Sequence, residues 1–401
     1  MQSRIDGRAR RSRSKLAIIV TAGDRGFDAH RSVFVPSGGI CRCSSCDAHV
    51  MAIVAGVQIR HDVPKAGPGP DNSQGTPMKA ILCSQFCQPD DLVLADVPDP
   101  VAGPGEAVIA IKAAALNFFD ILMIQGKYQM KPPFPFSPGA EVAGVIESVG
   151  EGVTDLKAGD RVVASCGHNG ARQKIALPAA AIVKIPDNLD FDRAAGIIII
   201  YGTALHALED RASPKPGETL AVLGAAGGTG LAACELGKLM GLKVIACASS
   251  DEKLEFARQH GATLTLNYAK EDLKEGLRRL TDGKGADIIF DPVGGTYAEA
   301  ALRSIAWEGR FLVIGFAAGD IPKMPLNLAL LKGCDIRGVF WGAWTRLNPE
   351  KNRANLEKLV QWTAEGKLSS HVDRTFPLAQ TADALKVLAG RQAMGKVILH
   401  P

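Results

Sequence analysis

A glycine-rich turn between a strand and a helix constrains this chain more than any other feature. The uncharged apolar run Thr219 to Leu223 is typical of a buried parallel strand, and Leu231 to Leu239 has the pattern of an amphipathic helix. Between them, Gly227 would let a pyrophosphate approach the backbone, and Gly230 would let the helix pack closely on the strand. Strand, glycine turn and helix in this order predict a dinucleotide site at the helix N-terminus.

The motif departs from G-x-G-x-x-G, because Ala225 stands where the first glycine is expected. Taken alone, the turn is as compatible with a ligand-free tight turn as with cofactor binding. The segment after the helix favours the cofactor, since Lys243 to Ala248 has the pattern of a second buried strand.

The residues after this second strand favour a phosphorylated cofactor. An NAD site places an acidic residue near the strand tip to bind the ribose 2′-hydroxyl, whereas this chain has Ala248 and Ser249 there. The hydroxyls of Ser249 and Ser250, with Lys253 one turn on, suit an added 2′-phosphate, so we expect NADP. The alternative is an ordinary N-cap at Ser250 with an exposed Lys253, and both interpretations can hold together.

Length and charge exclude several classes of function. A chain of 401 residues with 46% hydrophobic residues predicts two α/β globular domains. The net charge of +4 comes from residues 1–77, which hold eleven Lys/Arg against six Asp/Glu, while the rest holds 35 against 36. This balance argues against a nucleic-acid partner, and no apolar run reaches the length of a membrane span. The expected partner is a small molecule.

Residues 1–77 differ from the rest and allow three interpretations. They are a targeting segment, a metal site around Cys41, Cys43 and Cys46 with His49 as the nearest fourth ligand, or a mostly disordered extension upstream of a start at Met78. We favour the extension, because no strand and helix alternation is visible there. The other six cysteines are scattered, which fits reduced thiols in a cytoplasmic protein.

The pattern changes along the remaining chain. Short strands with glycine turns follow Met78 and predict a β-rich domain over 78–200. Strands alternating with helices predict a doubly wound, Rossmann-type α/β domain over 201–342. The tail, 343–401, is expected to return to the first domain, so that the cofactor domain is inserted into it.

Four motifs in this order make the chain resemble a known superfamily. They are Ala225-Ala-Gly-Gly-Thr-Gly230, Pro138-Gly-Ala-Glu-Val-Ala-Gly144, Gly159-Asp-Arg-Val162 and Gly395-Lys-Val397. Together they look like the medium-chain dehydrogenase/reductases, and the chain is most similar to the zinc-independent quinone oxidoreductase branch. The resemblance covers Met78 to Pro401, and implies a Rossmann NADP-binding domain inserted in a GroES-like substrate domain.

The resemblance also shows which metal ligands are missing. Zinc members hold a catalytic metal by a Cys, a His beside a Glu, and a later Cys, where this chain has Asn117, Ala140 beside Glu141, and the stretch around Ile199. The resemblance therefore implies no metal. Without a Lewis acid, the acceptor has to be electrophilic already, so hydride transfer from NADPH to a quinone or an α,β-unsaturated carbonyl is expected.

Site residues are implied by the resemblance, position by position. The candidate catalytic residues are Asn117, on the nicotinamide side, and Thr203, near the ribose and nicotinamide. Leu122 stands where some quinone reductases carry a substrate-facing Tyr, so water is the expected proton source. The expected NADPH contacts are Ala226, Gly227, Gly228, Thr229, Ser249, Ser250, Lys253, Tyr268, Gly315, Phe316, Phe340, Trp341 and Lys396.

Several alternatives remain open on the sequence. Tyr201 is either a proton donor or a core or wall aromatic. Phe340, Trp341 and Trp344 either stack on a flat acceptor or pack in the core. The whole chain is alternatively an enoyl-thioester (acyl-CoA) reductase, or a non-catalytic NADPH-binding redox sensor. A homodimer is expected by family analogy, with the strand near Asp335 to Phe340 pairing across a two-fold axis.

Overall fold

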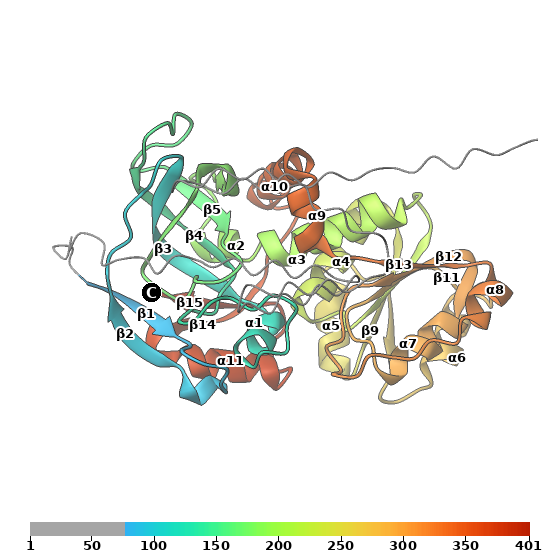
Figure 1. Cartoon of the computed structure of the whole chain (residues 1–401). Helices are drawn as coiled ribbons and strands as arrows, with labels where there is room; N and C mark the ends of the chain where they lie inside the picture. Colours follow the sequence, from blue (N-terminus) through green and yellow to red (C-terminus); the bar gives the residue numbers. More distant parts are fainter. Residues whose placement is uncertain (1–76) are drawn as a thin grey trace, which may run out of the picture. The chain divides into compact units, whose positions relative to one another are not determined.

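The computed structural model describes residues 77–401 (Figure 1). The expectations for residues 1–76, including the cysteine cluster at Cys41, Cys43 and Cys46, lie outside the described residues. Within the described part, no helix is both long and apolar enough to cross a membrane.

A parallel six-stranded sheet forms the cofactor-type lobe. Its strand order is β10-β9-β8-β11-β12-β13, and every neighbouring pair is parallel. This is the 3-2-1-4-5-6 order of dinucleotide-binding sheets. Strands β9 and β10 are added on one side of β8, and the chain then crosses over to add β11, β12 and β13 on its other side. The strands are β8 (Thr219–Leu223), β9 (Lys243–Ala248), β10 (Leu264–Asn267), β11 (Ala286–Asp291), β12 (Ile305–Val313) and β13 (Asp335–Gly338).

Helices cover both faces of this sheet (Figure 1). Leu220 and Val222 of β8 pack in one core with residues of α4 and α5, whereas Ala221 and Leu223 pack in another with α6 and α7. The alternation explains why β8 is apolar throughout, because both of its faces are buried. The helices are α4 (Gly228–Leu239), α5 (Asp251–Gln259), α6 (Leu273–Leu280) and α7 (Thr296–Arg303).

A mostly antiparallel seven-stranded sheet forms the second lobe. Its order is β14-β15-β3-β4-β5-β7, with β6 also pairing with β3. The last strand of the chain, β15, pairs antiparallel with β3, so the tail completes a sheet begun before the parallel domain. These strands are β3 (Glu106–Leu116), β4 (Glu141–Val149), β5 (Arg161–Ser165), β6 (Lys174–Pro178), β7 (Ile182–Lys184), β14 (Val372–Pro377) and β15 (Lys396–His400), and β1 (Met78–Leu82) pairs with β2 (Val93–Val97) beside them.

The predicted fold class, a doubly wound domain inserted in a β-rich domain, is confirmed. The proposed residue limits of 201–342 for the inserted domain stay a prediction. The remaining helices are α1 (Phe118–Ile124), α2 (Phe191–Ala195), α3 (Ile198–Leu205), α8 (Asn327–Lys332), α9 (Trp341–Leu347), α10 (Pro349–Ala364) and α11 (Thr381–Ala389), and a π-helical turn, His206–Ala212, extends α3.

The two lobes share one hydrophobic core. Ala113, Ala143 and Val163 of the seven-stranded sheet belong to the same buried cluster as Leu220 and Val222 of the parallel sheet. Helix α3 supplies the residues between them, since it is buried over most of its length. The core therefore fixes the end of β8 relative to β3 and β4, from which the candidate site residues project.

Candidate functional site

The glycine turn lies at the C-terminal end of β8, as predicted, but a different glycine makes the turn. Gly224 has a φ of +61°, a conformation that favours glycine, and a Cβ on Gly230 would lie 2.3 Å from its carbonyl oxygen. Gly224 and Gly230 together allow the close approach of strand and helix. Ala225 stands at the first position of G-x-G-x-x-G, as the sequence showed, and Gly224, one residue earlier, is the glycine that adopts the positive φ of the turn.

Helix α4 presents its N-terminus at this turn. Gly227 is its exposed N-cap, and a Cβ there would come no closer to other atoms than 3.4 Å. Gly228 and Thr229 are partly exposed, whereas Ala226 is buried. The first turn of a twelve-residue helix is thus partly exposed at a point where an anion is electrostatically favoured.

The end of β9 carries the predicted 2′-phosphate residues. The Ser250 Oγ accepts a hydrogen bond of 3.3 Å from the Lys253 backbone N–H, so Ser250 is indeed the N-cap of α5. Ser249 is exposed and lies within hydrogen-bonding reach of Tyr268, whose pKa burial raises to about 12. The structure therefore brings Ser249, Ser250, Lys253 and Tyr268 to one strand end.

Arg391 joins this group and was missed by the sequence reasoning. Its backbone carbonyl accepts a 3.0 Å hydrogen bond from Lys253 Nζ, and its guanidinium donates to the Ala317 carbonyl at 2.9 Å. The positive charge of Arg391 also acts to lower the pKa of Tyr268. The sequence around Gly390-Arg391 does not indicate that Arg391 belongs to this group, because Lys253, to which it is hydrogen-bonded, lies 138 residues away.

A second polar cluster is buried around Asn117. The Asn117 Nδ2 donates to Glu141 Oε1 at 3.0 Å, and Lys396 Nζ donates to Asn117 Oδ1 at 2.8 Å and to Glu141 Oε1 at 2.7 Å. The other oxygen of Glu141 accepts the Ile199 backbone N–H at 2.8 Å. Asn117, Glu141 and Lys396 are exposed by 6%, 0% and 2%. The interior therefore holds an ion pair that orients the Asn117 amide.

This cluster lies where the resemblance places zinc ligands. Asn117, the segment of Ala140 and Glu141, and Ile199 converge as that resemblance implies, but they offer neither a thiolate nor an imidazole. Among residues 77–401, no group of three His, Cys, Asp or Glu side chains has the arrangement of a metal site. The donor set does not fit a zinc ion, and an ammonium group, that of Lys396, lies among these residues instead.

Asp120 supports the same cluster from the first turn of α1. It is fully buried, and its carboxylate accepts the backbone N–H groups of Asn117 at 2.7 Å and Gly139 at 2.9 Å. Burial raises the pKa of Asp120 to about 7, although both hydrogen bonds oppose the shift. The carboxyl joins the start of α1 to the Pro138-Gly139 turn that leads into β4.

One C-terminal segment connects the two clusters. Gly395 forms a parallel β-bridge with Gly227, while the next residue, Lys396, contacts Asn117 and Glu141. Gly395 has a φ of +109°, and a Cβ there would lie 2.6 Å from the His371 carbonyl oxygen. The ammonium group of Lys396, which was predicted as a cofactor contact, is therefore bound by protein oxygens in this structure. Direct contact between Lys396 and the cofactor stays a prediction.

The other predicted residues lie around these clusters. Thr203 is partly buried on α3, and Gly315 follows β12 with its N–H bound to the Asp291 carbonyl at 3.3 Å. Phe340 is 56% exposed, whereas Trp341 is 8% exposed and packs against Gly202 of α3. Tyr201, the alternative proton donor, is fully buried and donates to Glu235 at 2.9 Å.

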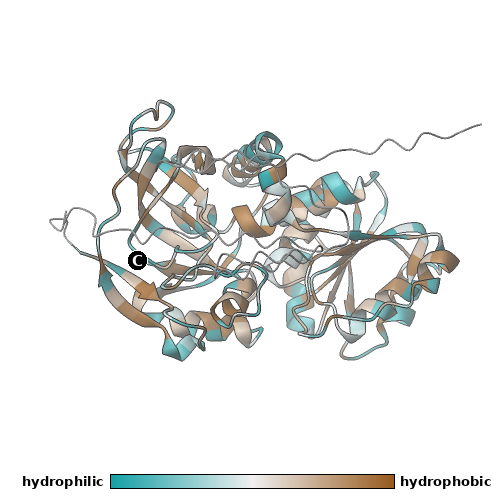
Figure 2. Ribbon diagram, viewed as in Figure 1, coloured by the Kyte–Doolittle hydropathy of each residue, from teal (hydrophilic) through white to brown (hydrophobic). Residues whose placement is uncertain are grey.

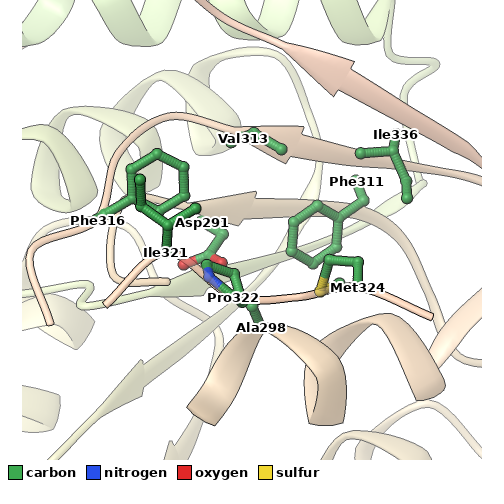
Figure 3. A pocket seen from close by; sticks show the side chains of 9 residues that line it. All are labelled: Asp291, Ala298, Phe311, Val313, Phe316, Ile321, Pro322, Met324 and Ile336. Atoms are coloured by element: carbon green, nitrogen blue, oxygen red, sulfur yellow. The ribbon is translucent and has the colours of Figure 1, made fainter. Parts of the chain in front are cut away.

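Phe316 lines a small apolar pocket of about 120 Å³ on the parallel lobe (Figure 3). In that view its ring lies with Ile321 and Pro322, at the same pocket as the Asp291 carboxylate. Asp291 Oδ1 accepts the N–H groups of Val293 and Gly294, and burial raises its pKa. The contact of Phe316 with a nicotinamide stays a prediction.

Comparison with known families supports the two-lobe architecture. Residues 103–187 match the alcohol dehydrogenase GroES-like domain, and residues 228–364 match the zinc-binding dehydrogenase family. The quinone oxidoreductase-like protein 2 homolog of Nematostella vectensis is 38% identical over 326 residues, which cover 80% of this chain and 88% of that protein.

Two solved structures share the fold over the whole of their chains. Pseudomonas syringae quinone oxidoreductase has a TM-score of 0.76 at 32% identity, with 81% of this chain and all of that chain covered. Escherichia coli quinone oxidoreductase, solved in complex with NADPH, has a TM-score of 0.75 at 27% identity, with 80% of this chain and all of that chain covered. With its motifs, topology and relatives in agreement, this chain belongs to the quinone oxidoreductase branch of the medium-chain dehydrogenase/reductase superfamily.

Proposed function

We propose that this chain is an NADPH-dependent oxidoreductase that transfers hydride to a quinone or another activated alkene or carbonyl acceptor. Its family supports an oxidoreductase with a nicotinamide cofactor, because relatives are named quinone oxidoreductases and the Escherichia coli structure holds NADPH. Bound NADPH would supply the hydride, and the protein would supply binding, orientation and the exclusion of water.

The grouping at the end of β9 carries the choice of NADPH over NADH. Ser249, Lys253, Tyr268 and Arg391 provide hydroxyl donors and two positive charges there. The nearby carboxylate of Asp251 already accepts from Lys270 and Asn267, so it is held by other partners. Such a set suits a phosphate dianion better than a ribose hydroxyl, which would need an acceptor.

The N-terminus of α4 and Asn117 are assigned the two remaining roles, which are binding of the pyrophosphate and positioning of the nicotinamide or the acceptor. The N–H groups of Gly228 and Thr229 would hold the pyrophosphate, as their partial exposure at the helix start allows, while the exposed Gly227, whose own N–H is bound to the Gly224 carbonyl at 3.0 Å, would let it approach the backbone. The Asn117 amide keeps one N–H after donating to Glu141, and its orientation is fixed by Lys396. This N–H is the group we assign to positioning the nicotinamide or the acceptor.

An acceptor that is already electrophilic fits the residues at the site. Asn117, Ala140 and Ile199 provide no ligand that would hold a Lewis acid, and the buried Lys396 ammonium is neutralised by Glu141. Quinones and enones accept hydride without such activation. Since Tyr201 and Asp120 are both fully buried, we assign the accompanying proton to water.

Turnover with a panel of acceptors tests this function. Purified protein is mixed with NADPH and ortho-quinones, para-quinones, enones or an enoyl-CoA, and NADPH absorbance is followed. Turnover of a quinone or enone is expected. Preference for the enoyl-CoA would favour the enoyl-thioester reductase, and tight NADPH binding without turnover of any acceptor would favour the redox sensor.

The 2′-phosphate assignment has its own test in Lys253→Ala. Losing a hydrogen bond to a charged phosphate costs about 1.5–3 kcal/mol, so NADPH affinity is expected to fall roughly 10- to 100-fold. NADH affinity is expected to change little. Lys243→Ala is the matched control, because Lys243 is exposed at the opposite end of β9. Equal losses for both cofactors in Lys253→Ala would contradict the assignment.

We propose a homodimer formed through the free edge of β13 and the adjacent α8. Leu330 and Leu331 of α8 are 80% and 67% exposed, Ile336 of β13 is 37% exposed, and Figure 2 colours much of α8 as hydrophobic. Among the strands of residues 77–401, β13 pairs only with β12, and such an edge beside an apolar surface is suited to pairing with a second copy. Light scattering should show a dimer that Ile336→Lys weakens, while Val101→Lys, at an 85% exposed apolar residue elsewhere, leaves it intact. A monomeric wild type would overturn this proposal.

A further inference from the structure

Two cysteines outside the candidate site lie within reach of each other. Cys83 and Cys87 flank the exposed segment 84–86 after β1, and their sulfur atoms are 3.5 Å apart. No other two cysteine sulfurs in the part of the chain that the structure describes are within hydrogen-bonding distance. A disulfide requires about 2.0 Å, so the sulfurs need to approach by roughly 1.5 Å. We propose that Cys83 and Cys87 are a dithiol that a hydroperoxide oxidises to an intrachain disulfide.

The surroundings assign different roles to the two thiols. Cys83 is fully buried, whereas Cys87 is partly exposed and lines a surface hollow with Gln88 and Lys127. Burial raises the pKa of Cys83 to about 12 and also raises the pKa of Cys87, but a hydrogen bond from Cys83 opposes the shift at Cys87. Cys87 is therefore the thiol that meets the oxidant, and Cys83 is the one that resolves it.

The reaction balances with the hydroperoxide as the two-electron oxidant. The Cys87 thiolate attacks the terminal peroxide oxygen, the S–O bond forms as the O–O bond breaks, and an alcohol leaves, or water when the oxidant is hydrogen peroxide. The Cys83 sulfur then attacks the Cys87 sulfur, the S–S bond forms as the S–O bond breaks, and the departing hydroxide leaves as water with the Cys83 proton. Two thiols lose two electrons and two protons, and the peroxide is reduced.

The backbone around the pair limits where the movement occurs. The Cys87 N–H donates to the Ile124 carbonyl at the end of α1, and Cys83 exchanges two backbone hydrogen bonds with Phe136. Both cysteines are thus held on their backbone side, while Ser84, Gln85 and Phe86 between them are exposed. We expect rotation of the cysteine side chains, together with movement of this short exposed segment, to bring the two sulfur atoms together. The proposal does not depend on the identity of the hydride acceptor.

Peptide mapping of the full chain tests the proposal directly. Reduced protein is treated with hydrogen peroxide, denatured, alkylated with iodoacetamide and digested with trypsin. Cleavage after Lys79 and Lys112 gives one peptide that contains Cys83 and Cys87 and no other cysteine, so the cluster at Cys41 to Cys46 cannot contribute. The expected product is this peptide without alkyl groups and lighter by two hydrogens. A doubly alkylated peptide under these conditions overturns the proposal.

Control cysteines and single variants complete the test. Cys234 and Cys247 are buried, with no cysteine sulfur of residues 77–401 within bonding distance, and their peptides should stay alkylated. In Cys83→Ser, Cys87 should be trapped as a sulfenic acid by dimedone, whereas in Cys87→Ser the remaining Cys83 should stay a thiol. The rate of disulfide formation should rise with pH above 7, since the thiolate reacts. Equal oxidation of Cys83 with and without Cys87 would overturn the assigned order.

Discussion

The buried Lys396–Glu141 pair makes the sharpest prediction about stability. Glu141→Gln removes the negative charge while keeping the shape of the side chain. The Lys396 ammonium then stays buried with neutral hydrogen-bond partners, which are the Leu116 carbonyl and Asn117 Oδ1, at 3.1 and 2.8 Å, and the amide oxygen of the substituted side chain. Removing one member of a buried ion pair typically costs about 3–5 kcal/mol, because the other charge is left uncompensated. We expect Glu141→Gln to lower the free energy of unfolding by that amount.

A double-mutant cycle separates the pair from its surroundings. Lys396→Met should also be costly, since Glu141 would keep its charge with only the N–H groups of Asn117 and Ile199. Combining both substitutions removes both charges, so the double variant should be more stable than the sum of the single losses predicts, by about 2 kcal/mol or more.

Urea unfolding followed by tryptophan fluorescence measures these differences. The matched control is the Lys79–Asp96 pair, which has a similar distance of 2.7 Å but side chains that are 48% and 55% exposed. Lys79→Met and Asp96→Asn should each cost less than about 1 kcal/mol. Losses below about 1 kcal/mol for Glu141→Gln, or strict additivity with Lys396→Met, would refute the conclusion that this pair is a strongly coupled, desolvated unit.

Three further predictions concern the turn, the buried carboxyl and the cap. Gly230→Ala should abolish tight NADPH binding and destabilise the fold, because its Cβ would lie 2.3 Å from the Gly224 oxygen, whereas Gly342→Ala, with its nearest atom at 3.9 Å, should be tolerated in thermal unfolding. The pKa of Asp120 is raised to about 7 from an ordinary 3.8, so the folded state binds the proton more tightly than the unfolded state does. The contribution of this carboxyl to the free energy of unfolding should therefore fall as pH rises from about 4 to 7. Asp120→Asn should remove that pH dependence when urea unfolding is measured at several pH values. Ser250→Ala should cost about 1 kcal/mol through loss of the α5 N-cap, and Ser250→Asp should retain the cap while repelling NADPH in a binding titration.

The sequence carried most of the fold because the parallel strands are short, apolar and separated by helices with polar faces. It did not indicate α3, since Ile197 to Ile200 is uniformly apolar and lacks the 3.6-residue periodicity of a surface helix. That helix is buried on nearly all sides between the two sheets, so no polar face marks it. Uniform burial removes the alternation on which such predictions depend.

The candidate site was predictable where its residues are close together in sequence, and not where they come from distant parts of the chain. Ser249, Ser250 and Lys253 are neighbours in sequence, and their gathering at the end of β9 follows from strand and helix order. Arg391 reaches them from the returning tail, and the Lys396 ammonium binds Glu141, 255 residues away, so only the completed fold reveals these contacts. Gly224 could have been recognised, because it directly follows the last residue of β8 and the interval from Gly224 through Gly227 to Gly230 is regular.

The continuous core beneath both sheets has a consequence for how such an enzyme accommodates new acceptors. Swinging the lobes apart as rigid blocks would hydrate Ala143, Val163 and Leu220 together, at about 25 cal/mol for every Å² of apolar surface exposed. Peripheral loops are therefore expected to accommodate acceptors of different size, while the interface between the two lobes stays closed. For the same reason, a fragment that ends between β7 and β8 would expose the apolar side chains of Ala143 and Val163 that the parallel lobe covers, so we expect the two lobes to fold together.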